Sequence, residues 1–304
     1  MKARRIRPFI FTPSILTRAI LKPAILSFAL LSLALAGFSV PAQAQTFTFT
    51  QLDVPGSAST EADGINAELQ IVGFFVDSAG KQHGFLHQRG SFTQIDVPGA
   101  TATRTVGIND AGVIAGSFTD AAGVSHGIVG HPGSFTRFDF PGATSTLGLS
   151  VNNAGEVAGS FNDAAGQTHA FTKRGATFTQ FDFPGGHNTI AFSINDRDEI
   201  VGVFTNAAGV SHAFLRQRGV FTQFDPPGAA NSVAFGINVL GFIVGSFTDV
   251  AGAGHGFFDK AGHFAQLNFP GAASTDADGI NAEAVIVGDF FDNAGVEHGF
   301  IALH

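Results

Sequence analysis

The first residues that could do chemistry in this sequence are histidines that recur every 43 residues. Imidazole is a frequent metal ligand, so six of them in register could form a metal site. However, an Asp or Asn lies six residues before each one, and a hydrogen bond across a hairpin is the simpler explanation. Sixfold symmetry would also keep the rings too far apart to share one ion at about 2.1 Å. We therefore expect structural roles for His83, His126, His169, His212, His255 and His298.

The second set is a group of charged residues at two positions where the copies of the repeat differ. Both positions lie in the strand before a Gly-Ile-Asn segment, two residues apart, and therefore on the same face. They are acidic in the first and sixth copies, basic and apolar in the second, and apolar in the third to fifth, where they hold Leu147, Leu149, Ile190, Phe192, Val233 and Phe235. We expect an acidic sector with one arginine at a channel mouth, opposite an apolar sector. Its residues are Glu61, Asp63, Arg104, Asp276 and Asp278, extended by Glu68 and Glu283 in the next turn.

This acidic sector allows three interpretations. It fits the binding of a cation or a small polar ligand, and Ca²⁺ takes several oxygen ligands, although Asp276-Ala277-Asp278-Gly279 lacks EF-hand spacing. The carboxylates could instead act as acid and base in glycoside or ester chemistry, in a hydrolase or lyase. The third interpretation is a solvated acidic patch. We favour a non-enzymatic binding scaffold without a cofactor over an enzyme, and the sequence does not identify the ligand or a partner.

One further motif resembles a catalytic signature but does not fit its context. Gly123-Val124-Ser125-His126-Gly127 matches the G-x-S-x-G nucleophile pattern. That elbow requires a turn from a strand into a helix, whereas this segment lies in a hairpin. We interpret it as a false positive.

The elements that position these residues are copies of one repeat, which begin at residues 49, 92, 135, 178, 221 and 264. A Phe starts each copy, a Pro-Gly pair follows, and an Asn stands at the same place in every copy: Asn66, Asn109, Asn152, Asn195, Asn238 and Asn281. A period of roughly 40 to 50 residues with short strands is typical of β-propeller blades.

Each repeat predicts four short antiparallel strands. In the fourth copy these are residues 178–182, 190–195, 200–204 and 212–216, separated by Pro-Gly, Asn-Asp and Asn-Ala-Ala-Gly turns. Apolar residues on both faces of the strands indicate a sheet that is buried on both sides. We expect the Gly at the centre of the third strand, such as Gly202, to let the next blade approach closely.

The two ends of the chain predict a closed ring. The last copy ends after its fourth strand, and residues 46–53 supply an unpaired strand of the type that starts each repeat. This strand can complete the sixth blade and leave no open edge. The predicted fold is therefore all-β, a six-bladed β-propeller of four-stranded antiparallel blades closed by the N-terminal strand. An open solenoid does not explain the offset.

Residues 1–44 have the features of a signal peptide. Six basic residues and no acidic one are followed by an apolar run over 24–40 and by Ala42-Gln43-Ala44. The alternative, an uncleaved membrane anchor, would need about 20 apolar residues. We expect cleavage near Ala44, export of residues 45–304 to the periplasm or the medium, and no membrane association of the mature chain.

The composition of the chain limits the classes of binding partner that we expect. After removal of the leader the chain has 10 basic and 24 acidic residues, a formal net charge of −14, which disfavours nucleic acid and anionic membranes and favours a monomer. There is no Cys, hence no disulfide. The 34 Phe residues occur without Trp or Tyr, which suits a dry core and disfavours the exposed aromatic platform of a lectin.

Short motifs in the repeats resemble a known family. His169-Ala170-Phe171 and His212-Ala213-Phe214, with Asn-Asp-Ala-Gly and Asp-Ala-Ala-Gly turns elsewhere in the repeats, resemble the bacterial extracellular HAF-repeat proteins. Three copies have His-Gly-Phe instead, and the second has His-Gly-Ile. The resemblance covers all six copies and implies an exported, propeller-like repeat protein. It implies no catalytic residues, because the family supplies no established activity.

Overall fold

The computed structural model describes residues 46–304, which form 24 strands and six four-stranded sheets. The chain divides into two units, Met1–Ala44 and Gln45–His304, and the predicted signal peptide lies outside the described residues. Within the described part of the chain, no helix is long and apolar enough to cross a membrane.

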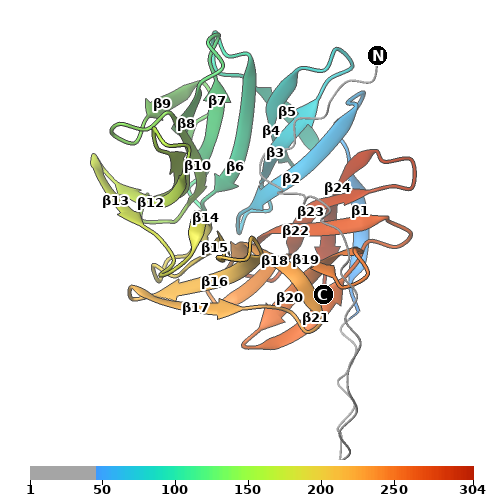
Figure 1. Ribbon diagram of the computed structural model, residues 1–304. Coiled ribbons are helices and arrows are strands. Elements are labelled where there is room, and N and C mark those ends of the chain that lie inside the picture. Colours follow the sequence, from blue (N-terminus) through green and yellow to red (C-terminus); the bar gives the residue numbers. More distant parts are fainter. Residues whose placement is uncertain (1–45) are drawn as a thin grey trace, which may run out of the picture. The chain divides into compact units, whose positions relative to one another are not determined.

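Each sheet is one blade (Figure 1). In blades 1 to 5 the strands follow the chain from the axis of the ring outwards, and in blade 6 the outermost strand is β1. Blades 1 and 2 consist of β2 (Ser59–Ile65), β3 (Ile71–Val76), β4 (Gln82–Gln88), β5 (Ser91–Ile95), β6 (Ala102–Ile108), β7 (Ile114–Thr119), β8 (Ser125–His131) and β9 (Ser134–Phe138). Blades 3 and 4 consist of β10 (Ser145–Val151), β11 (Val157–Asn162), β12 (Thr168–Arg174), β13 (Thr177–Phe181), β14 (His187–Ile194), β15 (Ile200–Thr205), β16 (Ser211–Gln217) and β17 (Val220–Phe224). Blades 5 and 6 consist of β18 (Ala229–Ile237), β19 (Phe242–Asp249), β20 (Gly254–Lys260), β21 (His263–Leu267), β22 (Ser274–Ile280), β23 (Ile286–Phe291), β24 (Glu297–Leu303) and β1 (Thr48–Leu52).

The first strand of each repeat therefore belongs to the preceding blade. In the fourth copy the predicted strand 178–182 corresponds to β13, which is the outer strand of blade 3. The innermost strands β2, β6, β10, β14, β18 and β22 each contact the next around the ring, including β22 with β2. This arrangement confirms the predicted six-bladed all-β propeller and places the Gly-Ile-Asn strands nearest the axis.

The N-terminal strand closes the ring as predicted. β1 pairs antiparallel with β24, with Thr48 opposite Leu303 and Leu52 opposite Gly299. Blade 6 is thus built from both ends of the described chain. The pairing satisfies the backbone groups of β24 that would otherwise form an open sheet edge.

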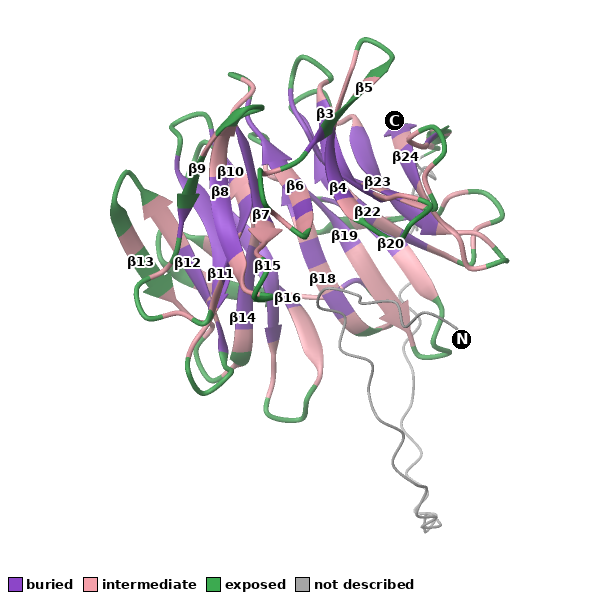
Figure 2. Cartoon of the chain, turned by 90° about the horizontal axis from the view of Figure 1, so that it is seen from above, coloured by how far each residue is buried: buried purple, intermediate pink, exposed green. Residues whose placement is uncertain are grey.

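The aromatic residue of the His-Ala-Phe motif forms the core of the blades. Five of these side chains are completely buried: Phe85, Phe171, Phe214, Phe257 and Phe300. In blade 2 the equivalent residue is Ile128, and the ring of Phe138 lies against Gly127 instead. Buried residues lie along the inner strands of the blades, and exposed residues lie along the loops and on outermost strands such as β13 (Figure 2). The Phe-rich composition therefore serves a dry core, as predicted.

The predicted role of the strand-centre glycines in blade stacking is wrong. A Cβ atom at Gly202 would collide with the carbonyl of Ile190 and the ring of Phe214, both in its own blade. The cause is a β-bulge in the innermost strand, which brings its backbone close to the second strand. The glycine one position before the Ile-Asn pair lies at a contact between blades, because a Cβ at Gly107 would lie 2.7 Å from the Cα of Ser150 in the next blade. Four copies have Gly at this position, and the other two have Ser150 and Ser193.

A closed ring of asparagines links the blades. Each Asn side chain donates from Nδ2 to the backbone carbonyl of the equivalent Asn in the next blade, at 2.9 to 3.3 Å. The last bond of the ring, from Asn281 to Asn66, crosses the closure. Each Oδ1 also accepts backbone N–H groups two and four residues later, as Asn109 does from Ala111 and Val113. The repeat therefore places one buried amide where it caps a turn and joins two blades.

Candidate functional site

The acidic sector predicted from the sequence lies on three innermost strands. β2 carries Glu61 and Asp63, β6 carries Arg104, and β22 carries Asp276 and Asp278. β2 is the neighbour of both other strands, since the closed ring places blade 6 beside blade 1. The sector therefore spans the closure.

The simple alternation from which we predicted a shared face does not apply here. A bulge interrupts the register between Ala62 and Gly64, so Asp63 is the extra residue of β2, and Asp278 is the extra residue of β22. A bulge re-aims a side chain. Asp63 still reaches the same partner as Glu61, because Nη2 of Arg104 donates to both carboxylates, to Oδ1 of Asp63 at 2.7 Å.

Arg104 is held by charge and by an aromatic ring. Its guanidinium carbon lies 4.4 Å from the ring centroid of Phe74, a cation–π distance. Burial alone would lower the pKa of Arg104, but the carboxylates of Asp63 and Glu61 outweigh burial and raise it. Arg104 therefore stays charged and neutralises part of the sector.

One arginine does not balance the carboxylates around it. Burial raises the pKa of Asp63 well above its usual value; Arg104 lowers it in part, while Glu61 raises it further. Burial also raises the pKa of Asp278, and the charges of Glu61, Asp276 and Asp63 add to the effect. Asp63 is 7% exposed. Asp278 is partly exposed, but its Oδ2 atom is buried. Oδ2 of each has no hydrogen-bond partner among residues 46–304, so both carboxylates can accept a proton or a cation.

The apolar sector also forms as expected. Leu149 and Ile190 are buried in one cluster with Val203, and Leu147, Phe192 and Val233 pack against it. The rings of Phe192 and Phe235 meet edge to face at 4.9 Å. These residues belong to blades 3, 4 and 5, across the ring from the closure. The axis is therefore lined by one charged and one apolar side.

The predicted extension of the acidic sector by the next turn has weaker support. Glu68 and Glu283 are exposed and lie in the turns after β2 and β22, beside Asn66 and Asn281. In these turns their backbone N–H groups donate to the Asn side chains, which accounts for their conformation without a ligand role.

Two acidic residues next to this sector were missed from the sequence. Asp289 lies on β23 directly opposite Asp276, and Glu297 begins β24. Burial raises the pKa of Asp289 well above its usual value, followed by the charges of Asp276, Asp278 and Glu61. The signal was present, since both positions are acidic only in the last copy of the repeat. To connect these two residues with Glu61, however, one must know which blade faces lie against each other.

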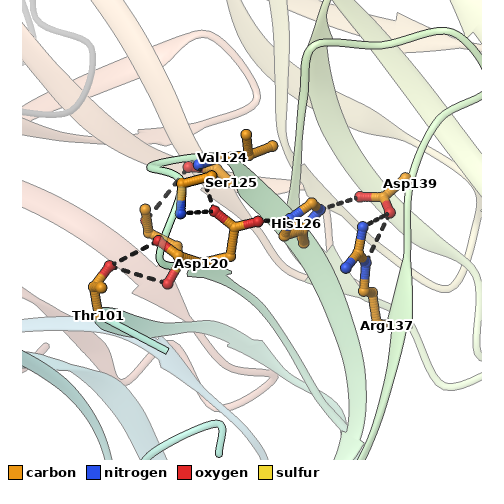
Figure 3. A network of polar contacts seen from close by, with 9 residues as sticks. Thr101, Asp120, Val124, Ser125, His126, Arg137 and Asp139 are labelled. Carbon is orange, nitrogen blue, oxygen red and sulfur yellow. Dashed lines mark hydrogen bonds and ion pairs between the residues drawn. The ribbon is translucent and has the colours of Figure 1, made fainter. Parts of the chain in front are cut away.

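The six histidines have the structural environment that we predicted, and no cluster of three or more metal-ligating residues among the described residues contains one of them. Five place Nε2 3.2 to 3.7 Å from the Asp six residues earlier, and in the fourth copy His212 contacts Asn206 at 2.9 Å. Figure 3 shows His126 lying between Asp120 and Asp139. The second carboxylate was not foreseen.

This second partner joins the outer strand of the blade to the third strand. His126 Nδ1 lies 2.7 Å from Oδ1 of Asp139, thirteen residues later. For His298 the same partner is Asp53 at 2.9 Å, so the closing strand β1 completes the sixth bridge. In the fifth copy Asn268 takes the place of the Asp. Each histidine therefore ties a hairpin loop to the outer edge of its blade.

A surface pocket of about 280 Å³ lies beside the bridge shown in Figure 3. Ser125, His126, Arg137 and Asp139 line it together with residues 140–146. Arg137 stands where the other copies have Gln, and its Nε donates to Oδ2 of Asp139 at 2.8 Å. Because Asp139 contacts both Arg137 and His126, the pocket offers a ligand few free polar groups.

The two groups of carboxylates predict a stability optimum at mildly acidic pH. Backbone N–H groups, foremost that of the residue four positions later, lower the pKa of the hairpin carboxylates below 3.8: Asp77, Asp120, Asp163, Asp249 and Asp292. Their contribution is present above that value and is lost as the pH falls through their lower folded-state values. Asp63, Asp278 and Asp289 have raised pKa values, so their ionised forms destabilise the fold at a pH above their folded-state pKa values. Stability therefore rises as the pH falls from those pKa values towards 3.8.

Melting temperatures of metal-free protein measured by circular dichroism between about pH 3 and 8 check this prediction. The Asp289→Asn variant should flatten the decline on the neutral side and leave the acidic side unchanged. A profile that falls monotonically from neutral to acidic pH would contradict it.

Fold and site together define a six-bladed β-propeller whose innermost strands carry a charged sector at the closure. No family model matches the sequence, and no curated protein matches it significantly. Solved structures of similar fold include AofleA from Arthrobotrys oligospora, at 10% identity over 86% of this chain and 88% of that one, with a TM-score of 0.52. The fucose-specific lectin from Aleuria aurantia is similar at 11% identity over 81% and 93%, with a TM-score of 0.50. A sialidase from Trypanosoma rangeli matches at 8% identity over 84% and 58%, with a TM-score of 0.51. At these identities the similarity concerns the fold alone.

Proposed function

We propose that this protein is an exported β-propeller of the HAF-repeat type that serves as a binding scaffold, with its ligand site in the acidic sector around the axis. The observation that carries the proposal is the convergence of Glu61, Asp63 and Asp278 around the single cation of Arg104. The partly exposed carboxylates of Glu61 and Asp278, beside an apolar sector, suit a small ligand with a cationic or polar group and an apolar body. The net charge also favours the approach of cations.

The similar solved structures agree with a binding role in general terms but do not identify the ligand. One of them, from Aleuria aurantia, is a fucose-specific lectin. This chain has no Trp or Tyr, the residues on which sugars usually stack. We therefore do not extend sugar binding to it.

The binding role is tested by calorimetric titration of the protein with a panel of small ammonium compounds and neutral polyols in the presence of a chelator. We expect a cationic member to bind, and the Asp278→Asn variant to weaken binding at least tenfold because it removes a charge at the site. Glu283→Gln, an exposed carboxylate in a neighbouring turn, is the matched control and should bind as the parent does. Equal binding by all three proteins would refute the site.

The alternative is a hydrolase or lyase, and one observation favours it. A general acid must hold its proton near neutral pH, and burial raises the pKa of both Asp63 and Asp278. A panel of chromogenic glycosides and esters, tested with the parent, Asp63→Asn and Asp278→Asn, separates the two functions. Turnover by the parent that is lost in both variants would establish the enzyme instead of the scaffold.

A further inference from the structure

Three carboxylates meet where the last blade faces the first. Glu61 on β2, Asp289 on β23 and Glu297 on β24 each offer one oxygen, and these three oxygens all lie within 4.8 Å of one another. β2 packs against both β23 and β24, so the group joins blade 1 to blade 6 across the closure. We call these three residues the seam triad.

Burial makes this arrangement different from a surface acidic patch. Asp289 is only 4% exposed, and its Oδ2 is buried without a hydrogen-bond partner among the described residues. A buried carboxylate oxygen without a donor is costly unless a proton or a cation compensates it. The nearby Arg104 donates to Glu61 and Asp63. One oxygen of Asp289 lies within 4.8 Å of an oxygen of Glu61 and of an oxygen of Glu297.

The repeat itself shows that the fold does not require these carboxylates. The position of Asp289 holds Phe74, Ser117, Ser160, Val203 or Ser246 in the other blades. The position of Glu297 holds Gln82, Ser125, Thr168, Ser211 or Gly254. The position of Glu61 is acidic elsewhere only at Asp276, in the neighbouring blade. Five blades form without an acidic residue at the first two positions, so the seam triad serves another purpose than building a blade.

We propose that the seam triad binds one calcium-like divalent cation, which fastens blade 6 to blade 1 and thereby secures the closed ring. Three carboxylates and no nitrogen or sulfur ligand favour a hard cation over Zn²⁺. Ca²⁺ accepts six to eight oxygen ligands in flexible geometry, whereas Mg²⁺ requires a near-ideal octahedron and gives up its water reluctantly, so three carboxylates completed by water suit Ca²⁺ better. Carboxylates that bind in bidentate fashion, and water, would complete the coordination. The site shares Glu61 with the proposed ligand site but does not depend on that site being occupied.

The first experiment titrates metal-stripped protein with CaCl₂, and in parallel with MgCl₂, by isothermal calorimetry and by melting followed with circular dichroism. Circular dichroism is the suitable probe because the chain has no Trp or Tyr for intrinsic fluorescence. We expect one Ca²⁺ per chain and a melting temperature raised by roughly 5–10 °C at a hundredfold excess over Kd. Absence of a calorimetric signal, or an equal shift with Mg²⁺ or with NaCl at matched ionic strength, would overturn the proposal.

The second experiment uses substitutions that the repeat already tolerates. Asp289→Ser and Glu297→Ser install the residue that other blades hold at these positions, and both should abolish the Ca²⁺ heat and the Ca²⁺-dependent shift. The metal-free variants should melt no lower than the metal-free parent, because each loses a repulsive charge. Glu283→Gln is the control and should keep parental affinity. Retained Ca²⁺ affinity in both serine variants would overturn the proposal. The ammonium titration with Asp278→Asn, performed in chelator, is independent of this outcome, so the two proposals can fail separately.

Discussion

Removal of residues 46–53 is expected to abolish the cooperative folding of the propeller at moderate temperature. The deletion takes away β1, which pairs with β24 over Thr48–Leu52. Without β1, the edge of blade 6 at β24 is open. It also removes Leu52 and the half-buried rings of Phe47 and Phe49 from the core. Three such side chains contribute roughly 5 kcal/mol, which is comparable with the whole stability of a typical domain of about 5–15 kcal/mol.

Thermal melting and size-exclusion chromatography check this expectation. The truncated chain should lose its sharp transition or associate through the exposed edge of β24, because an unpaired edge invites pairing with another chain. A synthetic peptide of residues 46–53 should restore the transition by adding the missing strand. The matched control peptide replaces Phe49 and Leu52 with Asp and should not restore it. A truncated monomer that melts as the full chain does would contradict the closure by β1.

The repeat made most of the fold predictable. Equal spacing of Phe, Pro-Gly, Asn and His defined the blades, and the unpaired strand at residues 46–53 predicted the closure because the last copy lacked its partner. Glu61 and Asp63 could be associated with Arg104 for the same reason. Equivalent positions in neighbouring copies lie side by side around a ring, so the spacing of the repeat alone predicted that Glu61 and Arg104 are neighbours.

The remaining features depend on packing between sheets, which the repeat pattern does not encode. Asp289 and Glu297 lie on the second and third strands of blade 6 and meet Glu61 only because that blade lies against blade 1. Similarly, Gly202 was assigned to blade stacking because the bulge in β14 could not be seen in the sequence. A bulge changes which backbone atoms approach the neighbouring strand, and no fixed residue type marks its position in the sequence.

The Asn109→Ala substitution should destabilise the protein by about 3 kcal/mol, far more than is usual for a small polar side chain. Asn109 is 6% exposed. It accepts from Ala111 and Val113 at 3.1 and 2.9 Å, and it donates to the carbonyl of Asn152 at 3.0 Å. Each lost hydrogen bond costs about 1 kcal/mol, and buried groups left without a partner add to that cost. The corresponding fall in melting temperature is roughly 6–12 °C for a domain of this size.

A second substitution at the same position separates the turn cap from the link between blades. Asn109→Asp keeps the acceptor for Ala111 and Val113 but loses the donor to Asn152, and it brings a carboxylate oxygen close to that carbonyl. Since a protonated acid can donate again, the stability lost in this variant should be partly regained as the pH falls from about 7 to 4, whereas the alanine variant should show no such recovery. Asn153→Ala is the matched control: its side chain also bridges blades, to Asp110 and Asp196, but from an exposed position, and it should cost less than about 1 kcal/mol. Melting curves of the three variants across pH decide the matter, and equal losses for Asn109→Ala and Asn153→Ala would show that the buried ring of asparagines does not hold the blades together.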